Sequence, residues 1–203
     1  MVDFSPSSIA ALIVAASFAA GLNVYATVAT LGILAHFHWV QLPPGLDSLS
    51  NPWIIAIAAL LFAVEVFADK IPAFDLFWNA AHTFIRVPVA ALLAYRAASQ
   101  LSPEMQLLAA AGGAAIAALA HTSKTAARAL VTPSPEPVSN IALSAGEDVA
   151  AISLTWIATQ HPYVAGGIAC VGIVFLLLSL RWIAVRLKRM WRGPTGARSA
   201  ENS

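Results

Sequence analysis

Long apolar runs, bounded by proline or polar residues, divide the chain into six predicted helices. Several of these runs approach or exceed the roughly 18–20 apolar residues that carry a helix across the hydrocarbon core of a bilayer. Prolines mark the boundaries because proline fits the first turn of a helix and not its interior. The predicted spans are Ser7–His36, Pro52–Ala68, Ala73–Ser99, Glu104–Leu130, Asn140–Thr159 and Tyr163–Ile183.

Composition supports a membrane location. Of the 203 residues, 59% are hydrophobic and 10% are charged, whereas a soluble domain carries about 25% charged residues. A water-soluble domain is therefore excluded, and the pattern predicts an all-α, polytopic membrane protein. We expect one helical transmembrane domain over residues 1–192 and a disordered cytoplasmic tail over residues 193–203.

Charge at the C-terminal end predicts the orientation. Basic residues crowd the last part of the chain, from Arg181 to Arg198, and the positive-inside rule then places the C-terminus in the cytoplasm. With an even number of spans, the N-terminus would be cytoplasmic too. Trp182 and Trp191, beside the basic residues, are typical of interfacial anchors.

A weak internal repeat relates residues 7–100 to residues 104–190. In each half, a long helix with a polar break precedes a proline-rich loop and then a helix that carries acids. The breaks are Gly21-Leu22-Asn23 in the first half and His121-Thr122-Ser123-Lys124 in the second. Three spans per half would make this a 3+3 inverted repeat, a design of many transporters whose sites lie at the repeat interface.

Polar and charged residues inside the predicted spans are the candidates for function. A charge at the bilayer centre costs at least about 2.5–3.5 kcal/mol, so these residues must pair, face water or lie near an interface. The residues that we expect to line a polar cavity or substrate path are Asn23, Glu65, Asp69, Lys70, Asp75, Asn79, His82, Arg86, His121, Lys124, Arg128, Ser144, Glu147 and Asp148.

Helical spacing organises these candidates into stripes. The residues from Asp75 to Arg86 follow one face of the third span, and those from His121 to Arg128 follow one face of the fourth. Ser144 and Asp148 are one turn apart on the fifth. We therefore expect a shared polar interior built from spans two to five, in which acids and bases nearly balance.

Several chemistries fit such an interior. Carboxylates with histidine suit a divalent metal, the basic side chains suit an anion or a lipid phosphate, and one acid suffices for proton coupling. The sequence contains no glycine-rich phosphate loop, nucleophile elbow or Cys/His pair. It predicts no enzymatic activity, no cofactor and no nucleic-acid partner, and it leaves homo-oligomerisation open.

Five segments carry a resemblance to a known family: Ala20–Tyr25, Glu65–Asp75, His82–Arg86, Ala120–Arg128 and Ser144–Asp148. Over about Ile9 to Ile183 the chain resembles a bacterial family of membrane proteins catalogued as a domain of unknown function, number four-one-two-six. The resemblance implies a bacterial inner-membrane location and no particular activity.

The residues therefore carry the functional prediction. We expect a transporter or channel for a small ion or solute that passes through a charge-lined centre. The acids would bind a cation or proton, and the bases would balance them or hold an anion. The alternative is a membrane scaffold that transports nothing and whose charges are structural salt bridges.

Overall fold

The computed structural model describes residues 4–68, 72–131 and 137–191, without the side chains of 68–81, 127–140, 187 and 189–191. No described residue forms a strand, so the all-α prediction is confirmed. The elements are α1 (Pro6–Leu22), α2 (Val24–His36), the 3-10 helix η1 (Pro44–Ser50), α3 (Pro52–Ala68), α4 (Pro72–Ala97), α5 (Pro103–Val131), α6 (Pro137–Gln160) and α7 (Pro162–Trp191). Every α-helix except α2 begins at a proline, the position at which the missing N–H costs nothing.

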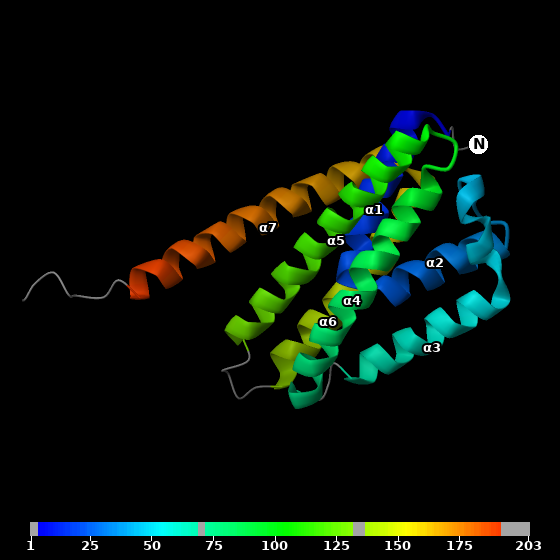
Figure 1. Ribbon diagram of the computed structural model, residues 1–203. Coiled ribbons are helices and arrows are strands. Elements are labelled where there is room, and N and C mark those ends of the chain that lie inside the picture. Colours follow the sequence, from blue (N-terminus) through cyan, green and yellow to red (C-terminus); the bar gives the residue numbers. More distant parts are fainter. Residues whose placement is uncertain (1–3, 69–71, 132–136, 192–203) are drawn as a thin grey trace, which may run out of the picture.

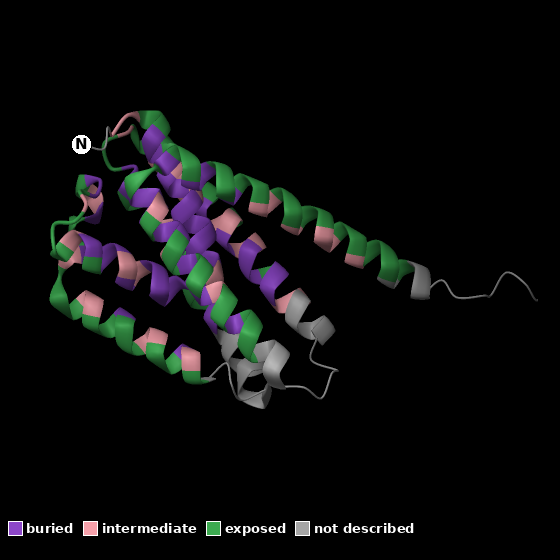
Figure 2. Ribbon diagram, turned by 180° about the vertical axis from the view of Figure 1, so that it is seen from behind, coloured by how far each residue is buried: buried purple, intermediate pink, exposed green. Residues whose placement is uncertain are grey.

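The α1 helix forms the centre of the bundle. It packs against α4, α5, α6 and α7, and most of its residues from Ser8 to Gly21 are buried (Figure 2). Its side chains are small or apolar on every face, as expected of a helix that is surrounded by other helices.

The chain turns back at Asn23, where α1 ends and α2 begins (Figure 1). Leu31 of α2 packs beside Ile13 of α1. Farther on, Gln41 and Leu42 line the same small cavity as Phe4 at the start of α1. The two helices therefore form a hairpin whose tip lies inside the bundle and whose two ends lie together at one end of it.

The other helices continue past this tip. The α1 helix ends beside Arg86 of α4, which lies fourteen residues after Pro72, the first residue of α4. Tyr163 at the start of α7 meets Ser7 at the start of α1, and α7 then diverges from the other helices and extends away from them (Figure 1). The described N- and C-terminal ends of the chain therefore lie at opposite ends of the molecule.

Glycines let α1 approach its neighbours closely. A Cβ atom at Gly21 would lie 2.7 Å from the Ala117 carbonyl oxygen of α5. A Cβ atom at Gly113 of α5 would lie 2.6 Å from the Ala94 Cβ and 2.9 Å from the Ser17 Oγ. Small residues at helix contacts are typical of helix packing in lipid, and here they keep the tip of α1 against α5.

The structure changes the predicted set of spans. The segment predicted as one span, Ser7–His36, is two helices of 17 and 13 residues that turn back on each other. Among the described helices, α5, α6 and α7 are long and apolar enough to cross a membrane, and the pair η1 and α3, bent by 70°, makes a fourth. Six spans are therefore not confirmed, although several apolar helices support membrane association.

The inverted repeat is not confirmed either. The polar segment that begins at His121 was expected to break a helix as Asn23 does, but α5 runs through it without interruption. Asn23 can end a helix because its side chain caps the next one, whereas the segment after His121 continues in helical geometry. The tail predicted over residues 193–203 lies outside the described residues.

Gly112 and Gly113 offer a matched pair of substitutions on α5. We expect Gly113→Ala to lower the free energy of unfolding by about 1–3 kcal/mol, the usual cost of overpacking. Gly112→Ala should have little effect because no atom lies within 4 Å of its Cβ position. Thermal unfolding of both variants in the same detergent tests this, and equal unfolding temperatures would contradict the close α1–α5 contact.

Candidate functional site

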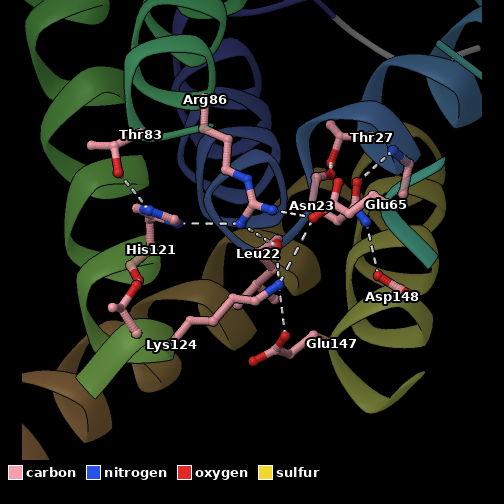
Figure 3. A network of polar contacts seen from close by, with 12 residues as sticks. Leu22, Asn23, Thr27, Glu65, Thr83, Arg86, His121, Lys124, Glu147 and Asp148 are labelled. Atoms are coloured by element: carbon pink, nitrogen blue, oxygen red, sulfur yellow. Dashed lines mark hydrogen bonds and ion pairs between the residues drawn. The ribbon is translucent and has the colours of Figure 1, made fainter. Parts of the chain in front are cut away.

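The break at Asn23 exposes backbone groups in the middle of the bundle. A helix that ends leaves carbonyl oxygens without partners, and a helix that begins leaves N–H groups without partners. Inside a membrane each such group costs several kcal/mol. Most of the polar candidates that the structure describes gather at this break (Figure 3).

Two basic side chains meet the C-terminal end of α1. Arg86 of α4 donates from Nη1 to the Leu22 carbonyl oxygen at 3.1 Å. Lys124 of α5 donates from Nζ to the same oxygen at 3.3 Å. Because the C-terminal end of a helix carries partial negative charge, both the hydrogen bonds and the charges favour this arrangement.

Asn23 and two acids meet the N-terminal end of α2. The Asn23 side chain accepts a hydrogen bond from the Ala26 N–H at 2.9 Å and donates one to Asp148 of α6 at 2.8 Å. Glu65 of α3 lies on the other side of Asn23 and forms an ion pair with Arg86 (Figure 3). Negative charge is stabilised at this end of a helix, so each end of the break faces side chains of the opposite sign.

A second ion pair forms the edge of the network. Lys124 Nζ lies 2.8 Å from Glu147 Oε2 and 4.0 Å from Glu65 Oε1. The side chains of Lys124 and Glu65 are 1% exposed, whereas that of Glu147 is 17% exposed. Glu147 is therefore the member of the ion-pair chain that is nearest to the surroundings of the bundle.

His121 extends the network towards Thr83. Its Nδ1 lies 3.2 Å from Arg86 Nη1, and a guanidinium can only donate, so Nδ1 must be the acceptor. A neutral imidazole then carries its proton on Nε2, which donates to the Thr83 hydroxyl at 2.8 Å. The contact with Arg86 therefore selects the neutral form of His121 and fixes its tautomer.

Comparison with known proteins adds the family. The family described as Domain of unknown function (DUF4126) matches residues 10–182. The chain belongs to the DUF4126 family. No curated protein and no solved structure matches it. The matched range of this DUF4126 member contains the whole network, from Asn23 to Asp148.

In this DUF4126 member, the structure brings half of the predicted site residues into one network. It joins seven of the predicted residues through the contacts above, namely Asn23, Glu65, Arg86, His121, Lys124, Glu147 and Asp148. His82 is buried with its ring edge-on to Tyr25, at 5.4 Å between the ring centroids. Ser144 is buried on α6, one turn before Asp148.

The remaining five predicted site residues lie where the structure describes no side chains. Asp69 and Lys70 lie outside the described residues, and only the backbone is described at Asp75 and Asn79 in α4 and at Arg128 in α5. Among the described residues searched, no cluster of histidine, cysteine and acidic side chains could hold a metal ion.

Sequence reasoning missed the groups that give the network its shape. The shared acceptor is the main-chain oxygen of Leu22, which no residue pattern reveals. Thr27 donates from its hydroxyl to the Asn23 carbonyl oxygen at 2.9 Å, and its position one turn after Asn23 was the available signal. Thr83 is adjacent to His82 but lies off the helical face that carries Asp75, His82 and Arg86, so helical spacing does not indicate it.

The Glu65–Arg86 pair should behave as a buried ion pair. We expect Arg86→Met to lower the free energy of unfolding by about 3–5 kcal/mol because it leaves a buried carboxylate without its main partner. The double variant Glu65→Leu/Arg86→Met should recover much of this loss. Arg96→Met is the control, since the Arg96 side chain is exposed and donates to the Gly45 carbonyl oxygen at the surface. The free energy of unfolding of each variant is measured in the same detergent. An Arg86→Met protein as stable as Arg96→Met would contradict the buried Glu65–Arg86 ion pair.

Proposed function

We propose that this protein is a transporter that moves a small ion or solute through the polar centre at the α1–α2 break. One observation carries the proposal: a helix stops inside an apolar bundle, and ionisable side chains from α3, α4, α5 and α6 surround its end. Broken helices whose ends face ions or substrates near the bilayer midplane are typical of secondary transporters. Ionisable residues within a membrane also favour a functional site.

The proposed arrangement in the bacterial inner membrane has five crossings, α3 to α7, and a re-entrant α1–α2 hairpin. The hairpin is too short to cross twice, since α2, at 13 residues, is about 20 Å long. Exposed aromatic residues support this placement. Trp39 and Trp53 lie where α2 and α3 meet η1, and Trp182 lies near the far end of α7, as expected of the two interfaces of a membrane.

The network favours a carrier over an open channel. Glu65, Arg86 and Lys124 have side chains at most 1% exposed and bind one another directly. An ion that crosses must displace these contacts, so the protein has to change conformation in each cycle. Glu147, the more exposed member of the chain of ion pairs, is the proposed first contact of an incoming proton.

A structural role is the second candidate, and the hydrogen bonds at the break favour it. Arg86, Lys124 and Asn23 satisfy the main-chain groups that the end of α1 and the start of α2 expose. A scaffold that needs a bent helix would use the same contacts. The two functions differ in whether substitution at the edge of the network changes flux without unfolding the protein.

The five-crossing arrangement is tested with reporters at the two ends of the chain. The basic end of α7 should be cytoplasmic, which places the N-terminus in the periplasm. We expect a cysteine introduced by Ser5→Cys, in a Cys170→Ser background, to react in intact cells with a membrane-impermeant maleimide, and a fluorescent protein fused after Ser203 to be fluorescent. Both ends reporting the cytoplasm would instead restore the arrangement with six spans.

Transport is tested with purified protein in liposomes. We expect protein-dependent flux of protons or of a small ion, and we expect Glu147→Gln and Lys124→Gln to lower it by about tenfold or more, because each removes a contact worth at least about 1.4 kcal/mol. Glu104→Gln, at the exposed start of α5, is the control and should retain full flux. Wild-type liposomes with no flux of protons, alkali cations or halides would leave the scaffold as the function.

A further inference from the structure

The Glu65 carboxylate occupies the position that a bound anion would take. It lies between two cations from different helices, paired with Arg86 Nη2 and 4.0 Å from Lys124 Nζ. Both cations also donate to the single Leu22 carbonyl oxygen, so their charged ends share one small space. Two buried cations this close require negative charge between them, and Glu65 supplies it.

We propose that a small monovalent anion replaces the Glu65 carboxylate between Arg86 and Lys124 when Glu65 takes up a proton. The protein would then carry one proton and one anion together. This inference rests on the proposed transport function and names its substrate class. It treats Glu65 as the group that binds the proton and Arg86 and Lys124 as the groups that bind the anion.

Charge balance favours this pairing. The proton forms an O–H bond with a carboxylate oxygen of Glu65, and nothing is oxidised or reduced. The anion accepts the hydrogen bonds from Arg86 and Lys124 that the carboxylate releases. The added charges cancel, so the total charge of the site is the same when empty and when loaded. A change of net charge in a dry interior would be costly, whereas this exchange avoids it.

An anion fits the site better than a cation does. Arg86 keeps its charge at any physiological pH, and a cation would have to approach both it and Lys124. The Arg86 side chain is also fully buried, and its Nε donor has no hydrogen-bond partner among the described residues. Such an orphan donor is rare in a folded protein, and it leaves the guanidinium with capacity to bind a further acceptor.

The neighbours of Glu65 are compatible with this role. Tyr25 of α2 is close enough to Glu65 for the two groups to interact electrostatically. Arg86 approaches Glu65 from α4, and Lys124 approaches it from α5.

Both cations also have partners other than Glu65. Glu147 of α6 forms a direct ion pair with Lys124, and His121 accepts a hydrogen bond from the Arg86 guanidinium. Asp148 bonds Asn23. Protonation of Glu65 therefore releases the Arg86 and Lys124 contacts without removing the other partners of either cation.

The first experiment uses wild-type protein in liposomes with an internal pH dye. An inward proton gradient is applied in chloride or nitrate, and in gluconate or sulfate as controls. We expect acidification of the interior that requires chloride or nitrate, and that does not change when valinomycin and potassium set the membrane potential. The independence of potential follows because one proton and one monovalent anion carry no net charge.

The second experiment uses Glu65→Gln, whose side chain resembles protonated Glu65. We expect anion-dependent proton movement to be lost, while chloride or nitrate flux persists and becomes driven by the membrane potential. Glu104→Gln should match the wild type in both assays. If Glu65→Gln does not fold, the wild-type dependence on anion and on potential decides the proposal by itself.

The outcomes separate this inference from the proposed function. Proton or cation flux that is the same in gluconate and chloride, or that follows the membrane potential, would overturn the anion site and leave transport standing. Loss of chloride flux together with proton flux in a folded Glu65→Gln protein would also overturn the exchange. Liposomes with no flux of any ion would overturn both.

Discussion

A helix end inside an apolar bundle is the constraint on which the rest of the structure depends. At Asn23 the main chain leaves helical geometry for one residue, and the Leu22 carbonyl oxygen loses its helical partner. Water cannot solvate such groups within a bilayer. Arg86 and Lys124 donate to this oxygen, and Asn23 caps the next helix. The break thus explains why these two cations are buried.

Three of the helices that pack against α1 each bring one part of this solution. The α4 and α5 helices supply the two cations, and α6 supplies acids. Close packing through Gly21 and Gly113 sets the distance between α1 and α5, and this distance decides whether Lys124 reaches the Leu22 oxygen. Helix packing and electrostatics are therefore not independent here, because a small increase in spacing would separate a buried cation from its acceptor.

The same contacts serve stability and suit transport. A network that closes the break is stable because opposite charges face the two helix ends. It can also change state, because Glu65 shares two cations with a main-chain oxygen that does not titrate. Proton uptake at Glu65 alters one contact of each cation and leaves others in place. In the proposed transport cycle, the fixed helix end would keep the two cations in place and the Glu65 carboxylate would be the movable counter-charge.

Local sequence signals were enough to predict the helical class, most helix boundaries and the polar candidates. Apolar runs and prolines predicted α3 to α6 and the start of α7 closely, since both signals are local, whereas α7 continues past its predicted end at Ile183 to Trp191. Helical spacing placed His82 with Arg86 and His121 with Lys124 on buried faces. Only the tertiary structure decided that α1 and α2 turn back at Asn23. Both helices are apolar, so hydrophobicity cannot distinguish a crossing from a hairpin, and the polar residues that stabilise the turn come from distant parts of the chain.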